Sequence, residues 1–306
     1  MLNGGTRCRT MKAGKIGLFI TIMGIYLLLT VSGPVLASPV GGGSPSVTGT
    51  SNYSLVGTRY YGSVTRLEAI GVLQGVYGVY PVNNRVSRTY LAETLIRMVQ
   101  LGNLVPAAEG PTMYSDVKAG SLLSGEVNLL DELNIMQGHN GVFSPAGSVT
   151  QAEAVRSIMS ALYYGQGVNG FDVSTVVRTA AQVGLIDAQG FQPDATLTMG
   201  QLALLLDNAL FEVKLPGSLE TLATSSFGVE FGTAWVTGSP VTGAPYDSLV
   251  FDSQVGAVSQ DTPVPLLLAP GLDVDSYLGQ KVRVGVAQLG GRSGYEVIYL
   301  KVLSTD

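Results

Sequence analysis

The sequence has very few of the residues that build the commonest catalytic and metal sites. Its single histidine is His139, and its single cysteine, Cys8, precedes a long apolar run. That inventory excludes the common zinc sites and a cysteine–histidine nucleophile. The spacings of a nucleophile elbow, a phosphate-binding loop and an EF-hand are also missing. We therefore expect a protein that is not an enzyme, with no catalytic residue, no metal site and no cofactor.

Charge is scarce as well, at 13% of residues. The first 37 residues hold four basic side chains and no acidic one, so the rest of the chain has 13 basic and 22 acidic residues, a net charge of −9. This balance argues against a basic face that binds nucleic acid. It also means that an anionic polymer would have to be bound in specific pockets.

The N-terminus has the pattern of an export signal. Basic residues precede the apolar run 16–29, and Val35, Leu36 and Ala37 follow a helix-breaking Ser-Gly-Pro. We predict a signal peptide over 1–37 and a flexible Gly/Ser/Pro-rich linker over 38–52. The alternative is an uncleaved membrane anchor, because the apolar stretch is long enough to span. Both readings place the remaining chain outside the membrane, and the first predicts a secreted protein.

One pattern occurs three times along the middle of the chain. In each copy an aromatic residue stands seven positions before a serine or threonine that fits a helix N-cap. The three pairs are Tyr80 and Ser87, Phe143 and Thr150, and Phe191 and Thr198. A helical apolar stripe follows each pair, and Thr150 with Glu153 has the spacing of a capping box.

A second helix precedes each aromatic residue. The predicted ranges are 66–73, 125–136 and 173–186, and each ends in a loop that contains glycine. Neither helix of a copy can bury its stripe alone, so the copies are expected to pack on one another. We assign the copies to 53–104, 112–165 and 168–213.

This unit resembles the S-layer homology domain, whose repeat contains S-D-V, a glycine turn ending in F-x-P, and T-R-A-E. The second copy matches best, with Ser115-Asp116-Val117, Phe143-Ser144-Pro145 and Thr150-Gln151-Ala152-Glu153. The resemblance implies a mainly helical bundle of three repeats in a pseudo-threefold arrangement. It also implies grooves that bind a secondary cell-wall polysaccharide, often a pyruvylated one, with the arginine of T-R-A-E at the carboxylate.

Here only the first copy keeps that arginine. It is Arg88, and the other copies have Gln151 and Met199 in its place. A guanidinium at a helix N-terminus would favour a carboxylate through forked donors and the helix dipole. The polysaccharide-binding residues we predict from the resemblance are Arg88, Ser87, Thr150, Gln151, Glu153 and Thr198.

The C-terminal part changes period. Val282, Val284 and Val286 alternate with Lys281, Arg283 and Gly285. The range 296–302 is another strand candidate across a glycine-rich hairpin loop. Ranges 227–236 and 248–255 are further strand candidates, so we predict a small all-β module over 220–306 after the bundle.

The function that we predict is non-enzymatic attachment to cell-wall polysaccharide at the cell surface. The alternative is a degenerate S-layer homology bundle that serves as a scaffold for a surface protein partner. We expect no nucleic-acid partner, and contact with the membrane only if the N-terminal segment stays uncleaved. A hydrolase in the β module is a third, weaker reading, since no catalytic constellation is visible.

Overall fold

The structure is a computed structural model that describes residues 55, 57–74, 80–164, 173–237, 249–255, 266–269, 272, 274–289 and 294–303. The described residues all belong to one compact unit. The predicted signal peptide and the predicted linker lie outside the described residues, as do Gly75 and Gly78 in the loop after the first predicted helix.

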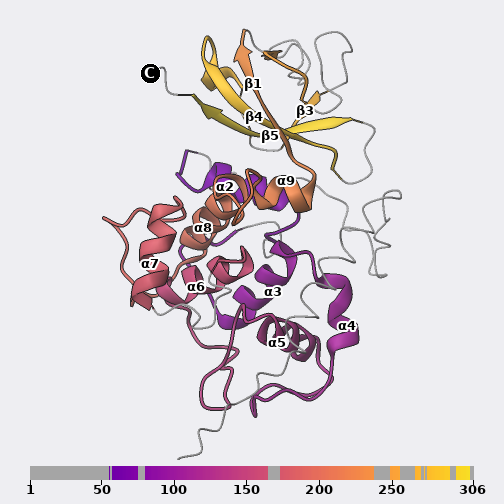
Figure 1. Cartoon of the computed structure of the whole chain (residues 1–306), viewed down its shortest axis with the longest axis vertical. Helices are drawn as coiled ribbons and strands as arrows, with labels where there is room; N and C mark the ends of the chain where they lie inside the picture. Colours follow the sequence, from indigo (N-terminus) through magenta and orange to yellow (C-terminus); the bar gives the residue numbers. More distant parts are fainter. Residues whose placement is uncertain are drawn as a thin grey trace, which may run out of the picture. The chain divides into compact units, whose positions relative to one another are not determined.

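The first part of the described chain is helical (Figure 1). The helices are α2 (Tyr61–Ala69), α3 (Arg88–Met98), η2 (Gly102–Leu104), α4 (Val105–Ala108), α5 (Leu122–Glu132), α6 (Gln151–Ala161), α7 (Val173–Gln182), α8 (Met199–Phe211) and α9 (Leu222–Phe227). The second helix of each copy begins at its expected cap, since the hydroxyls of Ser87, Thr150 and Thr198 each accept the backbone N–H three residues on. The complete capping box is at Thr198 with Gln201.

A ring of three backbone hydrogen bonds joins the copies just before these caps. The N–H of Val86 donates to the carbonyl of Leu197 at 3.0 Å, that of Leu197 to Val149 at 2.8 Å, and that of Val149 to Val86 at 3.0 Å. All three side chains are fully buried. Each short extended segment therefore satisfies its polar backbone on the other two copies, which fixes the three helix N-termini around one centre.

Helices from different copies pack on one another around this centre. Helix α2 lies on α8, α7 lies on α6, and α5 lies on α3, so each first helix covers the second helix of another copy. A bidentate pair fastens the first of these contacts: Arg66 on α2 reaches both carboxylate oxygens of Asp207 on α8, at 2.6 and 2.9 Å. The hydroxyl of Ser63 donates to the same carboxylate at 2.9 Å.

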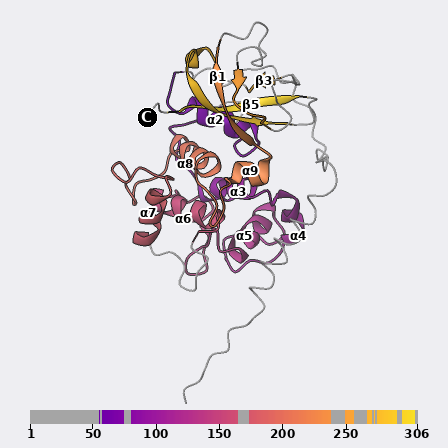
Figure 2. The same cartoon turned by 45° about the horizontal axis from the view of Figure 1, so that its top comes forward.

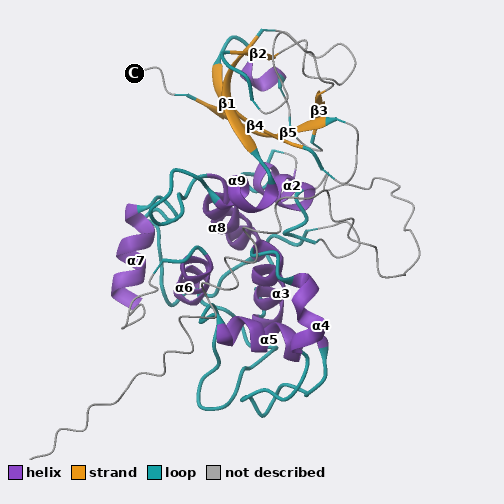
Figure 3. Cartoon of the chain, turned by 45° about the vertical axis from the view of Figure 1, so that its right-hand side comes forward, coloured by secondary structure: helices purple, strands orange, loops and turns teal. Residues whose placement is uncertain are grey.

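The C-terminal part forms a five-stranded sheet (Figure 3). Its strands are β1 (Glu230–Val236), β2 (Leu249–Phe251), β3 (Leu266–Leu268), β4 (Lys281–Ala287) and β5 (Tyr295–Val302). The order is β2-β1-β4-β5-β3, antiparallel throughout except for the parallel pair β3 and β5. The short helix η4 (Asp275–Tyr277) precedes β4.

The predicted fold class, a mainly helical bundle followed by a small all-β domain, is wrong. The architecture is mixed, with 39% helix and 19% strand among the described residues. One face of the sheet packs into the helical core: Phe211 at the end of α8 stacks on Tyr299 of β5 at 5.5 Å, and Phe231 of β1 meets both rings edge-on. Figure 2 shows β5 above α8 and α9. The strand pattern shows which residues are apolar, but not that helices cover them.

Candidate functional site

A cleft of about 580 Å³ opens between the first and second copies. Its walls are the start of α3, the loop from Asn134 to Ser144, and the exposed side of α6. We call it the inter-copy cleft. Its lining includes Arg88 from α3, His139 from the loop, and Glu153 and Arg156 from α6.

Arg88 is the first residue of α3 and its side chain is almost entirely buried beneath the loop. Its Nε donates to the carbonyl of Phe143 at 2.5 Å, and its Nη2 donates to the carbonyl of Gln137 at 2.8 Å. Its Nη1 forms an ion pair with Glu153. The guanidinium also lies over the ring of Phe143, 4.7 Å from its centre. Burial lowers the pKa of Arg88, and the charges of Tyr114 and Asp116 partly oppose that shift.

The loop is held from its other side by Asp116. Its carboxylate accepts the backbone N–H of Phe143 at 2.8 Å and that of Ser144 at 2.7 Å. These two hydrogen bonds are the main reason why the pKa of Asp116 is below its usual value. The aspartate of the S-D-V motif therefore fixes the F-S-P turn, where Ser144 has a left-handed φ of 59°.

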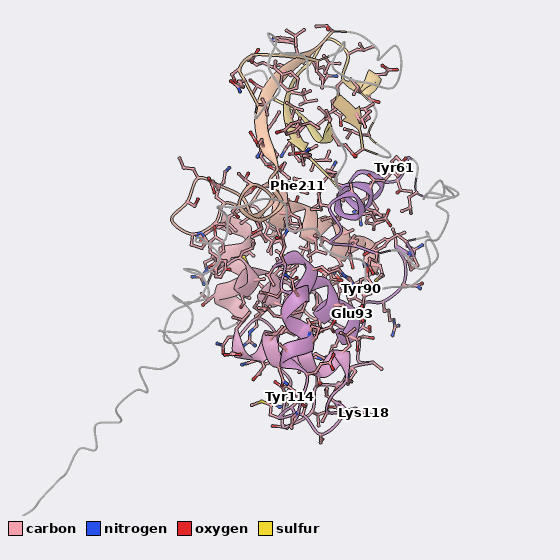
Figure 4. All side chains as sticks on the ribbon, turned by 90° about the vertical axis from the view of Figure 1, so that its right-hand side faces the viewer. Tyr61, Tyr90, Glu93, Tyr114, Lys118 and Phe211 are labelled. Atoms are coloured by element: carbon pink, nitrogen blue, oxygen red, sulfur yellow. The ribbon has the colours of Figure 1, made fainter. Side chains whose placement is uncertain are left out.

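Tyr114 braces the same loop near its start. Its hydroxyl donates to Asp131 on α5 at 2.8 Å and accepts the N–H of Gly138 at 2.8 Å. A Cβ at Gly138 would lie 2.4 Å from the Tyr114 ring, so only glycine allows this approach. The loop wall of the cleft is therefore set before any ligand arrives. Figure 4 labels Tyr114 at the end of the helical part farthest from the sheet.

The positions that correspond to Arg88 in the other copies face the loop of the next copy in the ring. The side-chain oxygen of Gln151 accepts the N–H of Gln192 at 3.3 Å. The carbonyl of Met199 accepts the hydroxyl of Tyr80 at 3.0 Å, and the Met199 side chain is buried. Both positions therefore contribute to packing between copies.

The structure brings together two of the six predicted polysaccharide-binding residues, Arg88 and Glu153, in the cleft. The hydroxyls of Ser87, Thr150 and Thr198 cap their own helices, and Gln151 contacts the third copy. The sequence reasoning missed Arg156, which lines the cleft three residues after Glu153. Residues three apart lie on one helix face, so the position of Arg156 relative to Glu153 could have predicted that it faces the same cleft.

Within the described ranges, no group of three or more histidine, cysteine, aspartate or glutamate side chains could hold a metal ion. Over the same part of the chain, no helix combines the length and the apolar character that crossing a membrane requires.

The chain is similar to three proteins of the bacterial cell envelope. A middle cell wall protein of Brevibacillus brevis is 31% identical over 48% of this chain. A surface layer protein of Brevibacillus choshinensis is 30% identical over 52%, and a cell surface protein of Thermoanaerobacter kivui is 27% identical over 76%. The chain spans only 14%, 14% and 30% of these relatives. No family model matches the chain.

Proposed function

We propose that the protein attaches to cell-wall polysaccharide by binding it in the inter-copy cleft. Its place is the cell surface, as for the envelope proteins to which it is similar. The observation that carries the proposal is the prebuilt cleft, whose loop wall is fixed by Arg88 and Asp116 without a ligand. A prebuilt wall lowers the entropy cost of binding a flexible glycan.

The shape and lining of the cleft suit a sugar. Its volume falls in the range of about 300–1,000 Å³ that is typical of ligand pockets. The lining joins apolar surface from Ile135, Val142 and Phe143 to polar groups of Gln137 and Arg156. An acidic sugar, including one with a pyruvate ketal, would find both apolar contact and charged donors there.

Sedimentation with cell-wall sacculi tests this function. The secreted protein should pellet with intact sacculi and stay in the supernatant when the sacculi have been stripped of their non-peptidoglycan polysaccharide. Stripped sacculi that retain the protein fully would contradict polysaccharide attachment.

A scaffold that binds a surface protein is the second candidate function. Two exposed apolar side chains within the second copy favour it, Met113 at 69% and Leu122 at 60% exposure. A scaffold would pellet only with sacculi that still carry their protein coat, whereas a polysaccharide binder would also pellet with sacculi cleared of protein.

A further inference from the structure

We infer that Arg156 is the residue that contacts a carboxylate of the glycan in the inter-copy cleft, and that Arg88 positions the cleft wall instead. This inference rests on the proposed function and names the ligand group that the cleft selects. It assigns the charged contact to a residue outside the T-R-A-E motif.

Arg88 has little left to offer a ligand. Its Nε, Nη1 and Nη2 are all engaged, by two backbone carbonyls and by Glu153. The ion pair cancels its charge locally, and only 9% of the residue is exposed. A ligand carboxylate would have to displace Glu153 or break the bonds that hold the loop, and either step would cost binding energy.

Arg156 is in the opposite situation. It is exposed on α6 and lines the cleft. It has no hydrogen bond or ion pair with any residue that the structure describes, and its nearest acidic neighbour on the helix face, Glu153, is committed to Arg88. Because the Arg88–Glu153 pair is neutral overall, Arg156 gives the cleft its net positive charge.

The corresponding positions in the other two copies cannot do this. Counted from the N-cap, Arg156 matches Glu93 in the first copy and Leu204 in the third. Glu93 is negative and pairs with Arg97 at 3.3 Å, and Leu204 has no charge. An acidic glycan should therefore bind in one place, the inter-copy cleft, although the fold repeats three times.

A free guanidinium fits a carboxylate through two parallel N–H donors. Two glycan sources supply that group, a ketal-linked pyruvate and a uronic acid. Mild acid removes the ketal and spares the uronic acid, whereas chemical reduction of carboxyl groups removes both charges. Solubilised wall polysaccharide in untreated, mild-acid-treated and carboxyl-reduced forms therefore identifies which of the two groups supplies the carboxylate.

The test titrates the full secreted protein with each form of the polysaccharide. Arg156→Gln should weaken binding to the untreated glycan about tenfold or more, as expected when a charge-assisted hydrogen bond is lost. Arg178→Gln is the matched control, because it removes the same charge from an exposed position on α7, outside the cleft. Binding by Arg178→Gln should stay within about twofold of the wild type, because an exposed charge outside the cleft contributes little.

The wild type should bind carboxyl-reduced polysaccharide as weakly as Arg156→Gln binds the untreated glycan. Wild type and Arg156→Gln should bind the reduced glycan equally, because the two changes remove the same contact. Equal binding of the untreated glycan by wild type and Arg156→Gln would overturn the inference and leave the proposed function standing. Failure of the wild type to bind any form would instead overturn the proposed function.

Discussion

Arg88 holds the loop wall of the cleft through its side-chain contacts. Arg88→Met keeps the stem but leaves Glu153 and the carbonyls of Gln137 and Phe143 without their donor. We expect a loss of about 1.5–3 kcal/mol in the free energy of unfolding, measured by urea denaturation. The control Arg85→Met changes an exposed arginine three residues earlier and should stay within about 0.5 kcal/mol. Equal stability of the two variants would mean that Arg88 does not hold the loop.

Glu126 gives stability a pH dependence. It is buried on α5 opposite α3. Burial raises the pKa of Glu126 from 4.5 to about 7; Glu93 adds to this shift and Arg97 opposes it. The folded state therefore binds this proton more tightly than the unfolded chain, so the contribution to stability is full below about pH 4.5 and is lost as pH rises through about 7.

Glu126→Gln should remove that dependence. At pH 8 the variant should be more stable than the wild type by about 1–3 kcal/mol, because no buried charge remains. Glu132→Gln, at an exposed position on the same helix, should change neither the stability nor its pH profile. Unfolding followed from pH 4 to pH 8 checks this, and parallel profiles for wild type and Glu126→Gln would contradict it.

For single residues, the sequence predicts contacts within one helical turn but not contacts between residues far apart in the chain. Ser87, Thr150 and Thr198 were found as caps because a cap needs only its own first turn. The pair between Arg88 and Glu153 joins two copies, and no spacing along the chain reports it. Thr150 and Glu153 looked like a complete capping box, but the Glu153 carboxylate is taken by Arg88.

At the scale of elements, apolar periodicity predicted the two helices of each copy and four of the five described strands, with errors at their ends, but it missed the short helices α4 and α9. The helix expected from 125 begins three residues earlier, because Ser121 caps it by accepting the N–H of Ser124. The strand expected from 227 begins at Glu230, since α9 ends at Phe227 and Gly228 turns the chain with a φ of 63°. Short β3 carries no alternation of its own, and it is defined by parallel pairing with β5.

The contact between α4 and α5 depends on a glycine, Gly125, which has no side chain. A Cβ at Gly125 would lie 2.3 Å from the carbonyl oxygen of Val105, a backbone atom that cannot rotate away. Gly125→Ala should therefore destabilise the protein by about 1–3 kcal/mol through overpacking. Gly102→Ala is the control, because its new methyl group would meet nothing within 4 Å. Thermal unfolding measures both, and an equal melting temperature for the two variants would contradict this packing.

At the scale of the molecule, the sheet and the helices share a core. Glu212, just after α8, accepts the hydroxyl of Tyr299 and pairs with Lys301 at 3.1 Å and Arg283 at 3.5 Å. Figure 4 labels Phe211 between the helices and the sheet. Sequence periodicity could not foresee this, because Phe231 and Tyr299 fit the alternation of a free-standing β module equally well.

A shared core predicts one unfolding transition. Trp235 is the only tryptophan and lies on β1, so its fluorescence reports the sheet, whereas far-ultraviolet circular dichroism is dominated by the helices. The two signals should change at the same urea concentration. Tyr299→Ala removes the stacked ring at the contact and should lower the free energy of unfolding by about 3–5 kcal/mol. The urea midpoints of both signals should fall by the same amount. Separate midpoints in the wild type would mean that the sheet is an independent domain.

A crystal structure of the secreted protein with a fragment of the wall polysaccharide would show directly where the glycan binds. We expect the sugar in the inter-copy cleft, with its carboxylate on Arg156 and with the Arg88–Glu153 pair still intact. A glycan bound elsewhere, such as on the exposed Trp235 of the sheet, or one that replaces Glu153 as the partner of Arg88, would contradict this assignment.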